Sequence, residues 1–243
     1  MWREASRPRA ALRATADLLW LEARLMTGGR LGLILLGQVA WLMTCAVMQH
    51  FRDEPWAEAS FYNRTVLLPV LLMAIALGMS CVLAERDIRH LEMSFSTAAG
   101  RYQLWAFRLA ALGLVLLAST ALLATLTWLL VARDVTPWTA TLHAFIPAAC
   151  IAVLAACLSL LFNEISTAGL VSLGLTVLAG MFLHGGGASR FDPFLNPFDP
   201  PTTLIEPAAW IRTLTFNRLF LLTALAIFTG ATLGLLQRRE RLL

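Results

Sequence analysis

The chain contains no lysine, and all 19 of its basic residues are arginines. Charged residues of every kind are scarce, at 14% of 243 residues, whereas a soluble domain has about 25%. The arginines are spread along the chain instead of clustering with aromatic residues, so we expect no nucleic-acid partner. The lack of lysine also excludes a Gly-x4-Gly-Lys-Ser/Thr phosphate-binding loop.

Six long stretches of the chain have no Asp, Glu, Lys or Arg and are rich in apolar residues. They are 31–51, 65–84, 109–132, 135–163, 165–189 and 219–237. A bilayer core about 30 Å thick is crossed by roughly 20 helical residues. Lipid offers no partners to backbone N–H and C=O groups, so each stretch is expected to be a helix. We predict an all-α membrane protein with six transmembrane helices, all in a single domain of residues 31–243.

The four cysteines match no zinc-binding spacing. Cys150 and Cys157 lie two turns apart on one predicted helix face, which is compatible with a soft-metal pair. A second group of soft-metal ligand types closes the first stretch: Met43, Cys45, Met48 and His50. Cysteine and methionine in such stretches more often serve as apolar packing residues. We therefore predict no metal site and no disulfide.

The arginines predict the orientation of the chain in the membrane. With a cytoplasmic N-terminus, thirteen arginines fall in cytoplasmic segments and six in external ones. This distribution agrees with the positive-inside rule. We therefore place both termini in the cytoplasm. We expect no cleavable signal peptide, because the first 30 residues lack a continuous apolar core.

Residues 1–30 read as an amphipathic helix that lies on the cytoplasmic membrane surface. Apolar residues recur at helical spacing, with arginines and an aspartate on another face. The apolar stripe is Leu12, Ala16, Leu19, Ala23 and Met26, and the charged face carries Arg13, Asp17 and Arg24. Trp20 suits the headgroup level, and Gly28-Gly29 ends the pattern. The alternative is a positively charged anchor that only sets the topology.

The cytoplasmic loop 85–103 has the pattern of a short amphipathic helix. Ile88, Leu91 and Phe95 share one helix face. Charges surround that face at Glu85, Arg86, Arg89 and Glu92. Such a helix can place its apolar side chains in a groove of a soluble partner, while the charges set the register. The alternative is a solvated loop whose charges only orient the chain.

These features resemble a type-2 ABC transporter permease over essentially the whole chain. In that family, Glu opens the loop before the third span, and Leu-Glu, small residues and a basic residue follow. The matching positions here are Glu85, Arg86, Asp87, Leu91, Glu92 and Ser96. Two departures occur: Arg89-His90 replaces the usual Gly-Thr, and Ala98 or Ala99 replaces the usual Pro. The ending Arg238-Arg239-Glu240 is similar to the endings of such permeases.

The resemblance implies a permease subunit of an ATP-driven exporter in a bacterial cytoplasmic membrane. Separate ATPase subunits would hold ATP and Mg, so this chain would bind no cofactor and would not itself be an enzyme. Two permease copies, as a homodimer, would form the pathway. The ATPase-coupling residues would be Glu85, Arg86, Ile88, Arg89, Leu91, Glu92 and Phe95. The family also includes members that serve cofactor maturation, and the sequence does not identify the cargo.

The connection 184–216 is predicted to be the longest external segment. Prolines and glycines punctuate it, and its aromatic residues include Phe191, Phe194, Phe198 and Trp210. We predict short re-entrant or interfacial helices here, with Trp210 at the headgroup level. By the resemblance, these aromatic residues belong to a lid over the pathway. The alternative is a plain external loop.

Another function remains open for the chain: a small channel or secondary carrier that works without ATP. A proton- or sodium-coupled carrier usually needs ionisable residues within its spans, and none of the six stretches contains Asp, Glu, Lys or Arg. This lack of mid-span charge favours amphipathic or lipid-linked cargo. Pro69 and Pro147 fall inside predicted spans, either as hinges or as ordinary membrane prolines.

Overall fold

The structure of the chain is a computed structural model. It describes residues 7–52, 56–86, 98–131, 133, 135–162, 165–179, 190–198 and 206–239. Throughout these segments the secondary structure is helix and turn, and they contain no strand. The predicted all-α class is therefore confirmed.

Five helices in the described segments are long and apolar enough to cross a membrane. They are α2 (Leu31–His50), α4 (Leu68–Arg86) with the turns that precede it, α6 (Ala98–Leu130), α7 (Pro137–Phe162) and α9 (Pro207–Arg239). The predicted stretch 165–189 contains α8 (Ile165–Ala179), which has 15 residues. The rest of that stretch lies outside the described residues, so the sixth span stays a prediction.

Helix α7 is the centre of the bundle, because it packs against α4, α6, α8 and α9. Its contact surface is made of small residues, among which Ala144, Ala148 and Ala152 are completely buried. Small residues let helix backbones approach closely in membranes. At Gly78 of α4 the approach is so close that an added Cβ would overlap the carbonyl oxygen of Ala152. Of an 18-residue apolar stretch in each helix, 67% of the residues are buried in α7 but only 17% in α2 and in α9, which lie outermost.

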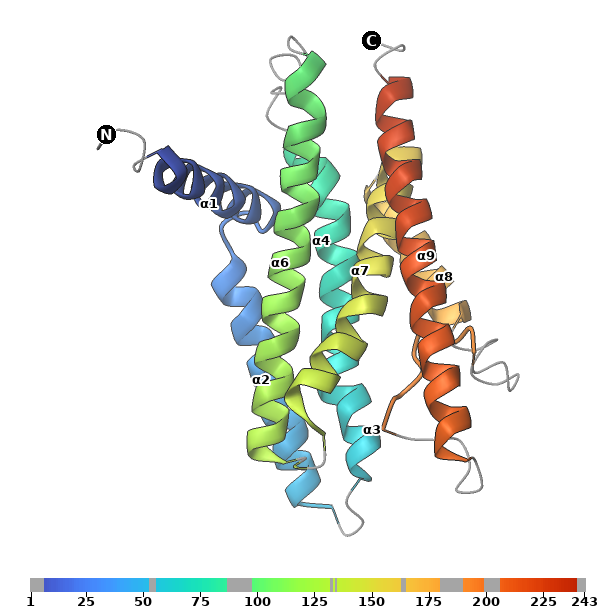
Figure 1. The fold of residues 1–243 in the computed structure, drawn as a ribbon. Helices are drawn as coiled ribbons and strands as arrows, with labels where there is room; N and C mark the ends of the chain where they lie inside the picture. The colour runs from blue at the N-terminus through green and yellow to red at the C-terminus, as the bar shows by residue number, and fades with distance from the viewer. Residues whose placement is uncertain are drawn as a thin grey trace.

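The long helices run side by side, and the bundle has two distinct ends (Figure 1). One end holds α1 (Arg7–Met26), the C-terminal end of α4, the start of α6 and the C-terminal end of α9. We call it the α1 end. The other end holds the short α3 (Glu58–Tyr62) and the starts of α7 and α9, and we call it the α3 end. Which end faces the cytoplasm stays a prediction.

Helix α1 lies at one side of the bundle and is oblique to α6 instead of parallel to it (Figure 1). It packs against α6 and α4. Its predicted stripe is buried only toward its C-terminal end, where Ala23 and Met26 are 6% and 3% exposed, whereas Leu12 is 70% exposed. The helix ends where expected, because Gly28 and Gly29 adopt φ of 58° and 73°, a conformation that favours glycine. The predicted helix is therefore confirmed, while its contact with lipid is still a prediction.

Two predicted loops are shorter in the structure because the neighbouring helices are longer than the apolar stretches. Helix α9 begins at Pro207, not near residue 219, so residues 207–216 are helical. Likewise, Glu85 and Arg86 belong to α4, and residues 98–103 belong to α6. Helices extend past an apolar stretch when their ends protrude from the hydrocarbon core. In the predicted external loop, residues 190–198 form turns, so the predicted re-entrant helices are not seen in this part.

A π-helical segment, η1 (Asn63–Leu67), directly precedes α4, in which Pro69 is the second residue. Proline has no N–H, so the carbonyl four residues earlier loses its helical partner. Just before this proline, the backbone N–H of Leu68 donates to the carbonyl of Asn63, five residues back, which is the π-helical spacing. Such π-turns often mark functional positions in helices. Pro147, in contrast, lies within the continuous α-helix α7. Neither proline is tested as a hinge.

Candidate functional sites

At the α1 end, a buried ion pair fastens α1 to the bundle. The Arg108 Nε of α6 donates to the Glu22 Oε2 of α1 at 2.9 Å. A second donor of the same guanidinium, Nη1, reaches the backbone carbonyl of Cys81 in α4 at 3.2 Å. The guanidinium also lies 5.2 Å from the centre of the Trp105 ring. One arginine therefore links three helices.

Both members of this pair are shielded from solvent, since Glu22 and Arg108 are 2% and 4% exposed. A buried charge is costly unless it is paired and hydrogen-bonded. Removing one partner of such a pair typically costs about 3–5 kcal/mol. The pair therefore makes α1, α4 and α6 depend on one another at this end. Sequence reasoning did not identify it.

The predicted ATPase-coupling segment joins α4 to α6 at this same end. Glu85 and Arg86 are placed in the last turn of α4. The other predicted coupling residues lie outside the described residues: Ile88, Arg89, Leu91, Glu92 and Phe95. Their role stays a prediction. Arg108 of the ion pair lies on α6, which follows this segment, and its Nη1 donates to the Cys81 carbonyl of α4, which precedes it.

At the α3 end, Arg218 of α9 is buried within a network of acceptors. Its Nη1 donates to the Asn217 side-chain oxygen at 2.8 Å, and its Nη2 donates to the Leu195 carbonyl at 2.9 Å. Its Nε donates to Nδ1 of His143 in α7 at 2.9 Å. The Asp192 carboxylate also acts on Arg218 electrostatically. The network connects α9, α7 and the segment 190–198.

The bond to His143 defines the state of that imidazole. A ring nitrogen that accepts a hydrogen bond carries no proton, so His143 is neutral with its proton on Nε2. A doubly protonated ring could not accept from Arg218 and would place a second positive charge beside it. The arrangement is therefore sensitive to the protonation of one histidine.

Two side chains within the segment 190–198 hydrogen-bond to its own backbone and shape it. The backbone N–H of Phe194 donates to the Asp192 carboxylate at 2.8 Å, and that of Phe198 donates to the Asn196 side chain at 3.0 Å. Both are turns of the kind that Asp and Asn favour. Asn217 then holds the segment from α9, since its side-chain nitrogen donates to the Asp192 carbonyl at 2.8 Å.

The four predicted lid residues fasten this segment to its surroundings. Phe191 meets Phe216 and Phe220 of α9 edge-on, at 5.6 and 5.2 Å between ring centres. Phe194 packs against the hydrophobic core.

Phe198 and Trp210 secure the far end of the segment. Phe198 meets the buried Tyr62 at 5.1 Å between ring centres. Trp210 is part of α9, and its Nε1–H donates to the Pro197 carbonyl at 3.3 Å. The structure thus gathers the four lid residues around one folded segment. Whether that segment covers a pathway is not tested.

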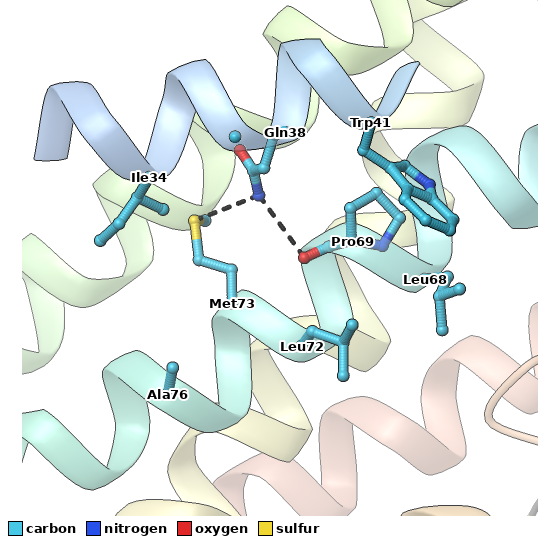
Figure 2. A pocket seen from close by; sticks show the side chains of 9 residues that line it. Ile34, Gln38, Trp41, Leu68, Pro69, Leu72, Met73 and Ala76 are labelled. Carbon is cyan, nitrogen blue, oxygen red and sulfur yellow. Dashed lines mark hydrogen bonds between the residues drawn. The ribbon is translucent and has the colours of Figure 1, made fainter. Parts of the chain in front are cut away.

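A groove between α2 and α4 holds a single amide at its floor (Figure 2). Its volume is about 380 Å³, and its walls include Trp41, Leu72 and Ala76. The Gln38 Nε2 points toward the Pro69 carbonyl and the Met73 sulfur, at 3.5 and 3.3 Å. These are weak partners for an amide donor. The groove therefore suits an apolar chain that carries a hydrogen-bond acceptor.

The amide oxygen of Gln38 is held firmly, in contrast to its nitrogen. Ser119 of α6 donates to this oxygen at 2.6 Å. Gln38 itself is 7% exposed. This polar contact connects α2 to α6 inside the bundle, and polar contacts of this kind join membrane helices. Sequence reasoning singled out neither residue.

Comparison with known proteins finds no matching family model, no matching curated protein and no matching solved structure. The architecture and its sites therefore have to be interpreted from their own geometry. Among the described residues, that geometry is a membrane-type helical bundle with a buried arginine toward each end, Arg108 and Arg218, and an apolar groove on its flank.

Proposed function

We propose that this chain is the membrane subunit of an ATP-driven exporter that docks separate ATPase subunits and pairs with a second copy. One observation carries the proposal: the Glu22–Arg108 pair joins α1, α6 and α4. Helices α4 and α6 flank the segment 87–97 that resembles an ATPase-docking loop. A displacement of that segment by a partner would therefore move three helices as one unit.

The packing of the bundle supports a route for this displacement to the α3 end. The close approach of Gly78 and Ala152 leaves α4 and α7 little freedom to slide independently. Helix α7 carries His143, which holds Arg218 and with it the segment 190–198. We infer that ATP-driven motion reaches the predicted lid through α4, α7 and α9.

The proposed cargo is amphipathic or lipid-linked. The groove of Figure 2 supports this class, because it is apolar and presents one amide donor with weak partners. A small hydrophilic ion would find few ligands in such a groove. A cofactor-maturation role is a further possibility within the same family resemblance.

The test is the double change Leu91→Asp with Phe95→Asp. We expect it to abolish co-purification of an ATPase that has the Gly-x4-Gly-Lys-Ser/Thr loop, while insertion into the membrane is preserved. Truncating an interface anchor costs about 1–3 kcal/mol or more, and a buried carboxylate costs more still. Phe51→Asp is the matched control, since Phe51 is 81% exposed and directly follows the last residue of α2. Undiminished ATPase association in the double variant would refute the docking.

A second candidate, the proton-coupled carrier, has one observation in its favour. Arg218 and His143 lie inside helices counted as membrane-spanning, although the sequence placed Arg218 in an external loop. The absence of Asp, Glu, Lys and Arg from the six predicted stretches therefore counts less against a proton-coupled carrier than the sequence suggested. A pH gradient that drives cargo into proteoliposomes without ATP would favour this candidate. Transport that requires ATP and a partner subunit would favour the exporter.

A further inference from the structure

A hollow of about 540 Å³ lies between α1, α2 and α6. Small residues are among those that line it, including Ala23 on α1 and Ala118 on α6. Trp20 of α1 lines it while remaining 63% exposed. Ser119 also lines it, but the Ser119 hydroxyl donates to Gln38. The surface offered to an occupant is therefore largely apolar.

The rim of this hollow on α1 is positively charged. Arg13 precedes Trp20 by seven residues and Arg24 follows it by four, so all three share one side of the helix. Asp17 lies on the same side and offsets one of the two charges. Glu22 offsets none of them, because it is buried against Arg108. The ion pair thus leaves the exposed side of α1 with a net positive charge.

We propose that the hollow binds one acyl chain of an anionic phospholipid, with the phosphate against Arg13 and Arg24. An interfacial helix with a basic face and an exposed tryptophan is suited to the level of the headgroups. The chain of a lipid in that leaflet would then enter the hollow below α1. A twofold contact through this face is disfavoured, since it would bring two basic rims together. The inference does not depend on the proposed exporter function.

Bromine on a lipid chain quenches tryptophan on contact, so Trp20 reports the occupant. The full chain is reconstituted into phosphatidylcholine vesicles that contain one fifth brominated phosphatidylglycerol or one fifth brominated phosphatidylcholine. The Trp20 signal is the difference between the unaltered chain and Trp20→Phe. A net charge of one predicts about fivefold stronger binding of the anionic lipid. We therefore expect markedly deeper quenching of Trp20 by phosphatidylglycerol.

Two sets of variants separate the contribution of the lipid headgroup from that of the acyl chain. Arg13→Gln with Arg24→Gln leaves Asp17 as the remaining charge of the three, so it should abolish or reverse the stronger quenching of Trp20 by phosphatidylglycerol. Ala118→Leu fills the hollow from an exposed position and should reduce quenching by phosphatidylglycerol to the phosphatidylcholine level. Gly113→Leu is the matched control on α6, because a Cβ there meets nothing within 4 Å and Gly113 does not line the hollow. Trp138, 71% exposed on α7, should be quenched equally by both lipids.

Three results would contradict the inference. Equal quenching of Trp20 by both lipids in the unaltered chain would mean that the hollow meets only bulk lipid. Quenching by neither lipid would mean that a polypeptide, a second copy included, covers it. Greater quenching by phosphatidylglycerol that survives the double arginine variant would also contradict the assigned phosphate position.

Discussion

The two ends of the bundle each bury an arginine, but they satisfy it differently. At the α1 end, Arg108 meets the carboxylate of Glu22 at 2.9 Å, so opposite charges face each other. At the α3 end, the hydrogen bonds of Arg218 go to a ring nitrogen, an amide oxygen and a backbone carbonyl. The first arrangement joins one helix to two others. The second holds a folded segment against two helices.

This difference determines which substitutions each of the two sites can tolerate. Charges that face each other can be removed together, and apolar residues of similar volume often replace such a pair without loss. Arg218 instead donates to three neutral acceptors while the Asp192 carboxylate also acts on it, so no single residue is its complement. Its removal leaves several acceptors unpaired, including the main chain of residue 195, which no side-chain substitution can remove. Coupling between residues should therefore be strong at the α1 end and diffuse at the α3 end.

The largest effect is expected when the ion pair is broken from one side. Arg108→Leu leaves Glu22 buried without this cation and should lower the free energy of unfolding by about 3–5 kcal/mol. The double variant Arg108→Leu with Glu22→Leu should recover most of that loss. The unaltered chain and the two variants are unfolded by titration with sodium dodecyl sulfate, and circular dichroism monitors the loss of helix.

The control for this prediction is Arg24→Leu, which removes an exposed arginine from the same helix as Glu22. Surface substitutions usually stay within about 0.5 kcal/mol. If the double variant is as unstable as Arg108→Leu alone, the two charges do not act as a pair, and the contrast between the two ends disappears.

A smaller and more local effect is expected for Arg218→Met. Hydrogen bonds to charged groups contribute about 1.5–3 kcal/mol, and here they hold the segment 190–198. Trypsin should therefore cleave faster after Arg190, an exposed residue at the start of that segment. Adding His143→Leu should not rescue the variant, because the acceptors of Asn217 and Leu195 stay unpaired.

Arg212→Met serves as the control for Arg218→Met, because Arg212 is an exposed arginine on the same helix. Cleavage after Arg190 should keep its original rate in this variant and in Arg108→Leu. Rescue by His143→Leu would show that Arg218 behaves as one half of a pair, as Arg108 does. That outcome would remove the distinction drawn between the two ends.

The helical architecture was predictable because lipid imposes it on every long uncharged stretch. The gathering of Phe191, Phe198 and Trp210 around one segment also agrees with their sequence clustering. The ion pair was missed because its members are 86 residues apart and Glu22 was given no role. A signal was present, since Glu22 lies on the same side of its helix as Leu19 and Met26. An acid on an apolar side requires a partner.

Arg218 was missed for a different reason, namely an incorrect helix boundary. The last uncharged stretch begins where the charges end, at residue 219, although the helix begins at Pro207. Proline favours the first position of a helix, so Pro207 was the available signal. Placing the start there would have put Arg218 within the helix. Its acceptors could still not be predicted, because Leu195 contributes only a backbone carbonyl.

The smallest effect is expected at Trp210, which separates the contribution of a lid side chain from that of Arg218. Trp210→Phe keeps an aromatic ring and removes the Nε1–H that donates to the Pro197 carbonyl at 3.3 Å. A single neutral hydrogen bond contributes about 0.5–1.5 kcal/mol, and the length of this one places it at the low end. Cleavage after Arg190 should therefore accelerate by no more than about threefold. Trp138→Phe is the control, because Trp138 is exposed. Acceleration equal to that of Arg218→Met would mean that the aromatic residues, and not the buried arginine, hold the segment 190–198 in place.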